Sequence, residues 1–154
     1  MKEEDKQVLK NKFKWTPLNE RLDKIGQPVP PRKADIRKPK LWLTEPFRIN
    51  NKDDLESYEV YLVNSSSITL ESVIIDSGGW SYFDDELVNS KQKKEIEYKN
   101  VKDGDAIKVL LYQPFYDDDE LTWFSLKIEM ANDIIDFSTS YNQNTKRVDK
   151  EVVI

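Results

Sequence analysis

The stretch LTWFSLKIEM, residues 121–130, decides the fold class because apolar and polar side chains alternate along it. Successive side chains of a β-strand point to opposite faces, so alternation indicates a strand with two unlike faces. One face is apolar and consists of Phe124, Leu126, Ile128 and Met130. The other face is mixed and consists of Trp123, Ser125, Lys127 and Glu129. We therefore expect a strand that buries the first face in a core and turns the second towards solvent.

The same β-rich texture extends from Leu41 to the end of the sequence. Short apolar runs are separated by turn residues at a spacing of about 10 residues, which is typical of a sandwich or barrel. The expected strands are residues 58–63, 68–75, 80–83, 93–98, 106–113 and 121–130, with 147–154 as an edge strand. The expected turns and loops are residues 64–67, 76–79, 84–92, 99–105 and 113–120. The sequence thus predicts a mostly β chain, with a single antiparallel β-sandwich domain over residues 45–154.

Residues 1–44 have a different pattern and form a predicted N-terminal arm. Leu9 and Phe13 share one face of a short helix expected at residues 3–14. A second helix is expected at residues 17–25, because a threonine N-cap precedes it and a glycine follows it. Prolines, which exclude a helix or a central strand, stand after it at positions 28, 30, 31 and 39. We expect the arm to consist of two short helices and a proline-rich extended connector.

The arm is basic and the body is acidic. Residues 1–40 hold 12 Lys and Arg against 6 Asp and Glu, whereas the remaining residues hold 12 against 23. The basic residues of the connector are Arg32, Lys33, Arg37, Lys38 and Lys40. Basic clusters bind nucleic acid in other settings, but an acidic body repels a polyanion, so no nucleic-acid partner is expected. The arm is expected to contact its own acidic body or another protein. In the second case, the apolar side chains along one face of helix 17–25 are expected to bind in a groove of that protein.

The chain contains no cysteine and no histidine. This composition excludes disulfides, thiolate or imidazole zinc sites, and every Ser-His or Cys-His nucleophile. No catalytic motif is present, so the sequence favours a protein that is not an enzyme. The first residues are charged where a secretory signal needs an apolar run, and no stretch has the roughly 20 apolar residues that span a bilayer. We expect a cytoplasmic protein without a membrane partner.

Two acidic segments are candidates for a metal site. If consecutive strands run up and down, the loops at residues 64–67, 84–92 and 113–120 emerge at one end of the domain. Carboxylates from neighbouring loops are the ligands that Ca²⁺ requires. The candidate Ca²⁺ ligands are Asp84, Asp85, Asp117, Asp118, Asp119 and Glu120, with oxygens of residues 64–67 added. The alternative is that these residues are solvated acidic turns that keep the protein in solution, and then no cofactor is expected.

A second candidate site is an apolar patch on the outer surface. In residues 106–113, alternation places Ile107, Val109 and Leu111 inside. If this run forms a hairpin with residues 121–130, outward side chains gather into one patch. The residues of the predicted patch are Leu110, Tyr112, Leu121 and Trp123, with Trp42 beside them. The patch is expected to be covered by a partner protein or by residues 41–43 of the arm.

Trp80 and Tyr82 share a strand face, on which aromatic rings stack against sugars in some proteins and fill a β core in many others. Asp103-Gly104-Asp105 is interpreted as a turn and not as a metal motif.

The sequence therefore predicts a non-enzymatic protein-interaction or assembly module. The alternative is a Ca²⁺-dependent or carbohydrate-binding β-sandwich module.

Overall fold

The computed structural model describes residues 6–10, 12–15, 39–49, 57–83, 86–89, 94–112, 121–142 and 147–154. Throughout these ranges the regular secondary structure is β, and they contain no helix. The strands are β1 (Val8–Lys10), β2 (Leu41–Leu43), β3 (Phe47–Ile49), β4 (Ser57–Asn64), β5 (Leu70–Phe83), β6 (Glu86–Asn89), β7 (Lys94–Val101), β8 (Asp105–Tyr112), β9 (Leu121–Met130), β10 (Asp133–Asn142) and β11 (Arg147–Val148). The prediction of a mostly β chain is confirmed. No helix in these ranges is long and apolar enough to cross a membrane.

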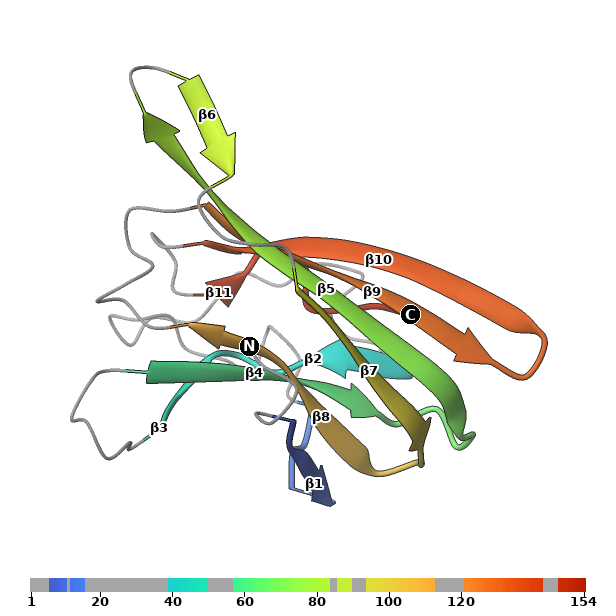
Figure 1. Ribbon diagram of the computed structural model, residues 1–154. Coiled ribbons are helices and arrows are strands. Elements are labelled where there is room, and N and C mark those ends of the chain that lie inside the picture. The colour runs from blue at the N-terminus through green and yellow to red at the C-terminus, as the bar shows by residue number, and fades with distance from the viewer. Residues whose placement is uncertain are drawn as a thin grey trace.

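The strands form two antiparallel sheets (Figure 1). The first sheet has the order β1-β8-β4-β2, and β3 also pairs with β4. The second sheet has the order β11-β10-β9-β5-β6, and β7 also pairs with β5. Strands β7 and β8 follow each other along the chain but belong to different sheets, so the turn between them carries the chain from one sheet to the other.

Both sheets contribute buried side chains to one hydrophobic core. Tyr112 of the first sheet stacks on Tyr141 of the second, with 3.9 Å between ring centroids. The four apolar residues predicted to form the inner face of β9 all lie in this core: Phe124, Leu126, Ile128 and Met130. Burial of each such side chain contributes about 1.5–3 kcal/mol, so this alternation is a major determinant of the fold.

The faces of β8 differ from the prediction because this strand contains a β-bulge. Val60 pairs with Leu110 and the next residue, Tyr61, pairs with Lys108, so Val109 is an extra residue without a partner. A bulge reverses the alternation beyond it. Leu110 and Tyr112, predicted to face outward, are therefore buried in the core, and their predicted orientation is wrong.

The second sheet contains longer strands than the alternation indicated. The predicted turn at residues 76–79 is wrong, since it lies within β5, where Gly78 pairs with Trp123 and Gly79 with Thr122. The two glycines therefore belong to a continuous antiparallel strand here and not to a turn. The predicted loop 84–92 contains β6, and β10 was not predicted at all.

The N-terminal segment adds a strand to the first sheet. The predicted helix at residues 3–14 is wrong for the residues described there, because β1 pairs antiparallel with β8, Leu9 opposite Ala106. An isolated short helix is marginal in water, whereas the free edge of β8 offers backbone partners and apolar contacts. The helix predicted at residues 17–25 lies outside the described residues.

The end of the chain contacts both sheets. Strand β11 pairs with the end of β10 in the second sheet. Val152 then forms a bridge with Trp42 of β2, and the Leu41 carbonyl accepts a hydrogen bond from the Val153 amide. The edge strand predicted at residues 147–154 is present over Arg147–Val148, and an isolated bridge follows at Val152. In the first sheet, β1 is thus the outermost strand beside β8, and the chain end lies beside β2.

The loop at residues 64–67 lies beside the turn at residues 102–105. The Asn64 carbonyl accepts a hydrogen bond from the Gly104 amide, and Asp103 Oδ1 accepts one from the Ser67 amide at 3.0 Å. Asn64 is fully buried and donates its side-chain amide to the Val101 carbonyl at 3.0 Å. An up-and-down order of the predicted strands places these two loops at opposite ends of the domain, and that placement is wrong. Strand β5 continues through the predicted turn at residues 76–79, and β6 and β7 both run antiparallel to it, so the chain returns to the end at which β5 begins.

Candidate functional site

A buried ion pair lies on the outer face of the first sheet. Glu59 Oε2 of β4 and Lys108 Nζ of β8 are 3.1 Å apart, and both side chains are less than a tenth exposed. Lys108 was predicted to face solvent. The N-terminal segment covers it, since the Lys108 amide donates to the Gln7 carbonyl at 3.0 Å.

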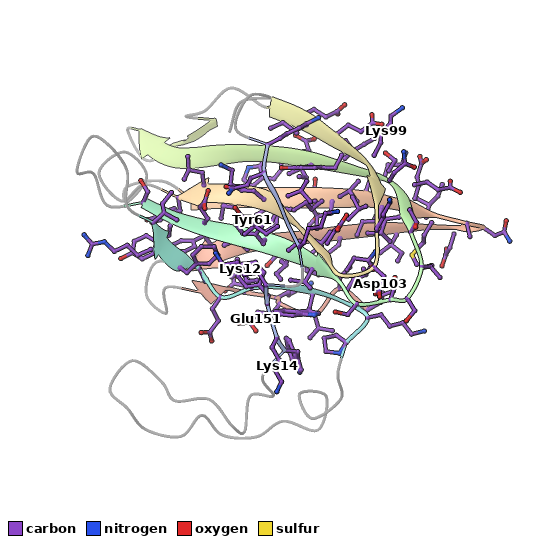
Figure 2. The ribbon with its side chains drawn as sticks, turned by 90° about the horizontal axis from the view of Figure 1, so that it is seen from below. Lys12, Lys14, Tyr61, Lys99, Asp103 and Glu151 are labelled. Carbon is purple, nitrogen blue, oxygen red and sulfur yellow. The ribbon has the colours of Figure 1, made fainter. Side chains whose placement is uncertain are left out.

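Tyr61 connects this ion pair to the N-terminal segment, and Figure 2 shows it near the middle of the molecule. Its hydroxyl donates to Gln7 Oε1 at 2.7 Å and also lies 3.3 Å from Glu59 Oε1. Burial, followed by the negative charge of Glu59, raises the pKa of the Tyr61 phenol well above its usual range. The phenol is therefore a neutral hydrogen-bond donor at physiological pH.

Aromatic side chains seal the same face. Phe13 lies 5.5 Å from Tyr61 and 5.6 Å from Phe47 between ring centroids, and Trp15 packs edge-on against Trp42 at 5.3 Å. At the segment's border, Lys10 Nζ pairs with Asp105 Oδ1 at 2.6 Å. The N-terminal segment thus covers this face with aromatic packing and hydrogen bonds, which are contacts suited to structural closure.

The predicted apolar patch is not formed. Strands β8 and β9 belong to different sheets, so they form no hairpin, and Leu110 and Tyr112 lie in the core. Trp42 is buried on the outer face of the first sheet with Trp15. Trp123 is half-buried on the second sheet, and its Nε1 has no hydrogen-bond partner among the described residues. The side chain of Leu121 lies outside the description, although its backbone is part of β9.

The other predicted site residues fall largely on segments that the structure does not describe. These are the acidic residues Asp84, Asp85, Asp117, Asp118, Asp119 and Glu120, and the basic residues Arg32, Lys33, Arg37 and Lys38. Lys40 is described and exposed. The backbone of Trp80 and Tyr82 pairs with β6, and their side chains lie outside the description. Within the described ranges no group of acidic side chains is arranged to hold a metal ion.

The feature that best fits a binding role is the outer edge of β10. Thr139 to Asn142 are covered there, because β11 pairs with Tyr141 and Asn142 and the Lys150 amide donates to Thr139 Oγ1 at 2.9 Å. Residues 133–138 pair with β9 on their other side, and no described strand pairs with their outer side. Figure 1 shows β10 at the border of its sheet. We call residues 133–138 the open edge.

The open edge has one apolar and one polar row of side chains. Ile135 and Phe137 are partly buried and pack against the core. Ile134, Asp136 and Ser138 are exposed on the outer face, and Ile134 is 57% exposed, the highest value among the exposed large apolar side chains of the described residues. A six-residue edge is about 20 Å long, which is the length of a typical strand.

The outer face of the second sheet beside the open edge is acidic. Cross-strand pairing places Asp136 beside Lys127, and Ile134 beside Glu129. Among the side chains that the structure describes on this face, carboxylates outnumber ammonium groups: Asp76, Glu95, Glu97, Glu129 and Asp136 stand against Lys99 and Lys127. Of these, Lys99 lies 3.5 Å from Glu97, and Figure 2 shows it at the far side of the molecule from Lys14.

No family model, no curated protein and no solved structure matches this chain.

Proposed function

We propose that this chain folds as a β-sandwich and acts as a non-enzymatic protein-interaction module, whose open edge binds an extended segment of a partner protein. Strand addition of this kind uses backbone hydrogen bonds for affinity and alternate side chains for specificity. The binding element is residues 133–138 of β10.

One observation supports the proposal: six consecutive residues of β10 pair with β9 on one side and with no described strand on the other, and they include an exposed isoleucine. An unpaired strand edge presents amide and carbonyl groups to which another strand can bind. The partly buried Ile135 and Phe137 lie at the border of the core, where an added strand can extend the apolar layer. The edge thus offers both backbone and apolar contacts to a partner strand.

The proposal is tested by amide hydrogen exchange on the full chain with a strand-forming peptide. We choose Thr-Val-Thr-Ile-Thr-Val-Thr with blocked ends, which is neutral and has high β propensity. In the free chain, every second amide of residues 133–138 points away from β9 and exchanges quickly. With peptide bound, these amides are expected to exchange more slowly, while the amides of β1 and β8 are unchanged.

A matched peptide controls for contacts that do not involve pairing. Thr-Val-Pro-Ile-Pro-Val-Thr keeps the apolar face but lacks two backbone donors, so it is expected to give no protection. Equal protection by both peptides, or protection confined to another strand, would show that the open edge is not a strand-binding site.

A further inference from the structure

We infer that the partner segment is basic: an amphipathic strand with Lys or Arg on one face and apolar side chains on the other. This inference rests on the proposed function and specifies its partner. It follows from the two different rows of side chains on the open edge and from the charge of the sheet face beside it.

The outer row determines the basic face of the partner. A strand added beside β10 places its outer side chains next to Ile134, Asp136 and Ser138. Asp136 has only Lys127 opposite it, while the wider face carries an excess of carboxylates. Lys or Arg beside Asp136 adds an opposite-charge pair, and its aliphatic stem covers the exposed Ile134. An acidic partner meets repulsion at the same position.

The inner row determines the apolar face. Ile135 and Phe137 pack against the core but remain partly exposed at its border. Side chains of the added strand on this side continue the core layer, so they need to be apolar. Alternation of basic and apolar residues satisfies both rows at once.

A second copy of the chain is a poor occupant. When two open edges pair antiparallel about Asp136, with the buried rows of both copies on the same side, Asp136 of one copy lies opposite Asp136 of the other. Like charges on facing strands are destabilising, and charged edges are a common device against self-association. The structure therefore favours a basic partner over a homodimer at this edge.

The inference is tested by titrating the full chain with three peptides that differ only in their polar face. They are Lys-Val-Lys-Ile-Lys-Val-Lys, the neutral threonine peptide above, and Glu-Val-Glu-Ile-Glu-Val-Glu. Dissociation constants are read from amide shifts of residues 133–138. We expect binding to tighten from the acidic to the basic peptide by about tenfold at low salt, and this difference to shrink at about 1 M salt.

Two charge variants test whether Asp136 is the source of the preference for the basic peptide. Asp136→Lys is expected to invert the order of the three peptides. Glu95→Lys makes the same charge change on β7, three strands and about 15 Å away, beyond the Debye length of about 8 Å at physiological salt. It is expected to leave the order unchanged.

The outcomes separate the two proposals. If the three peptides bind the open edge equally well, the basic partner is excluded and the strand-binding edge stands. If no peptide protects residues 133–138, both proposals are wrong. If the unmodified chain forms a dimer through this edge in the absence of peptide, a second copy is the occupant and the inference of a basic partner is overturned.

Discussion

The two sheets differ in how their borders are covered. In the first sheet, distant parts of the same chain lie beside β8 and β2: β1 pairs with β8, and Val152 near the chain end forms a bridge with β2. The second sheet leaves residues 133–138 of β10 without a described strand on their outer side. The outer faces of the two sheets also differ in their side chains. The outer face of the first sheet holds aromatic side chains and a buried ion pair, whereas that of the second carries charged side chains that water can solvate.

We call the outer face of the first sheet, which the N-terminal segment covers, the closed face. In the proposed function, the closed face contributes stability and the open edge is the recognition element. A buried ion pair contributes little net stability, but it becomes costly when one partner is removed. A charged open edge contributes little to stability, and its charges hinder pairing with other copies. Substitutions on the two regions should therefore have very different effects.

The largest effect is expected from Glu59→Ala on the closed face. This change leaves the Lys108 ammonium buried without its carboxylate, which costs about 3–5 kcal/mol of unfolding free energy. Urea unfolding followed by tryptophan fluorescence measures the loss. Glu97→Ala is the matched control, because the Glu97–Lys99 pair is largely exposed and is worth less than about 1 kcal/mol. Similar losses in both variants would contradict the distinction between the faces.

A second, smaller effect concerns the Tyr61 phenol at alkaline pH. Its pKa is raised by folding, so the unfolded chain releases this proton first, near pH 10. The contribution of Tyr61 to the unfolding free energy is therefore fully present below pH 10 and is lost as the pH rises beyond it. Between about pH 9 and pH 11, the unfolding free energy should fall more for the unmodified chain than for Tyr61→Phe. An equal fall in both would show that Tyr61 ionises as freely in the folded chain as in the unfolded chain.

The smallest effect is expected from a charge placed on the open edge. Ile134→Lys should change the unfolding free energy by less than about 0.5 kcal/mol, because the side chain is mostly exposed and packs little. Leu9→Lys places the same charge in β1 against the aromatic cluster and should cost more than about 1 kcal/mol. Thermal melting of both variants makes the comparison. A large loss for Ile134→Lys would show that the open edge is covered in the folded chain.

The missed strand β10 illustrates a limit of local pattern. Its inner residues Ile135, Phe137, Thr139 and Tyr141 do alternate, so the signal was present in the sequence. Ile134 next to Ile135 interrupts this alternation, and Asp133 and Asp136 have low β propensity, so the strand signal was weak. The candidate site therefore lies on a strand that the sequence pattern contained but did not make conspicuous.

The sequence by itself determined the β class and the inner face of β9, because alternation is a local property that any strand with one buried face must show. The Asp-Gly turn at residues 103–105 was equally local and is present as predicted. Only the tertiary structure decided the faces of β8, because the bulge at Val109 depends on pairing with β4, more than 40 residues away. The same holds for β1, which is a strand because β8 offers it an edge, and for the open edge, which exists because no described segment occupies it. Pairing between distant segments is a non-local choice, and composition and alternation carry no record of it.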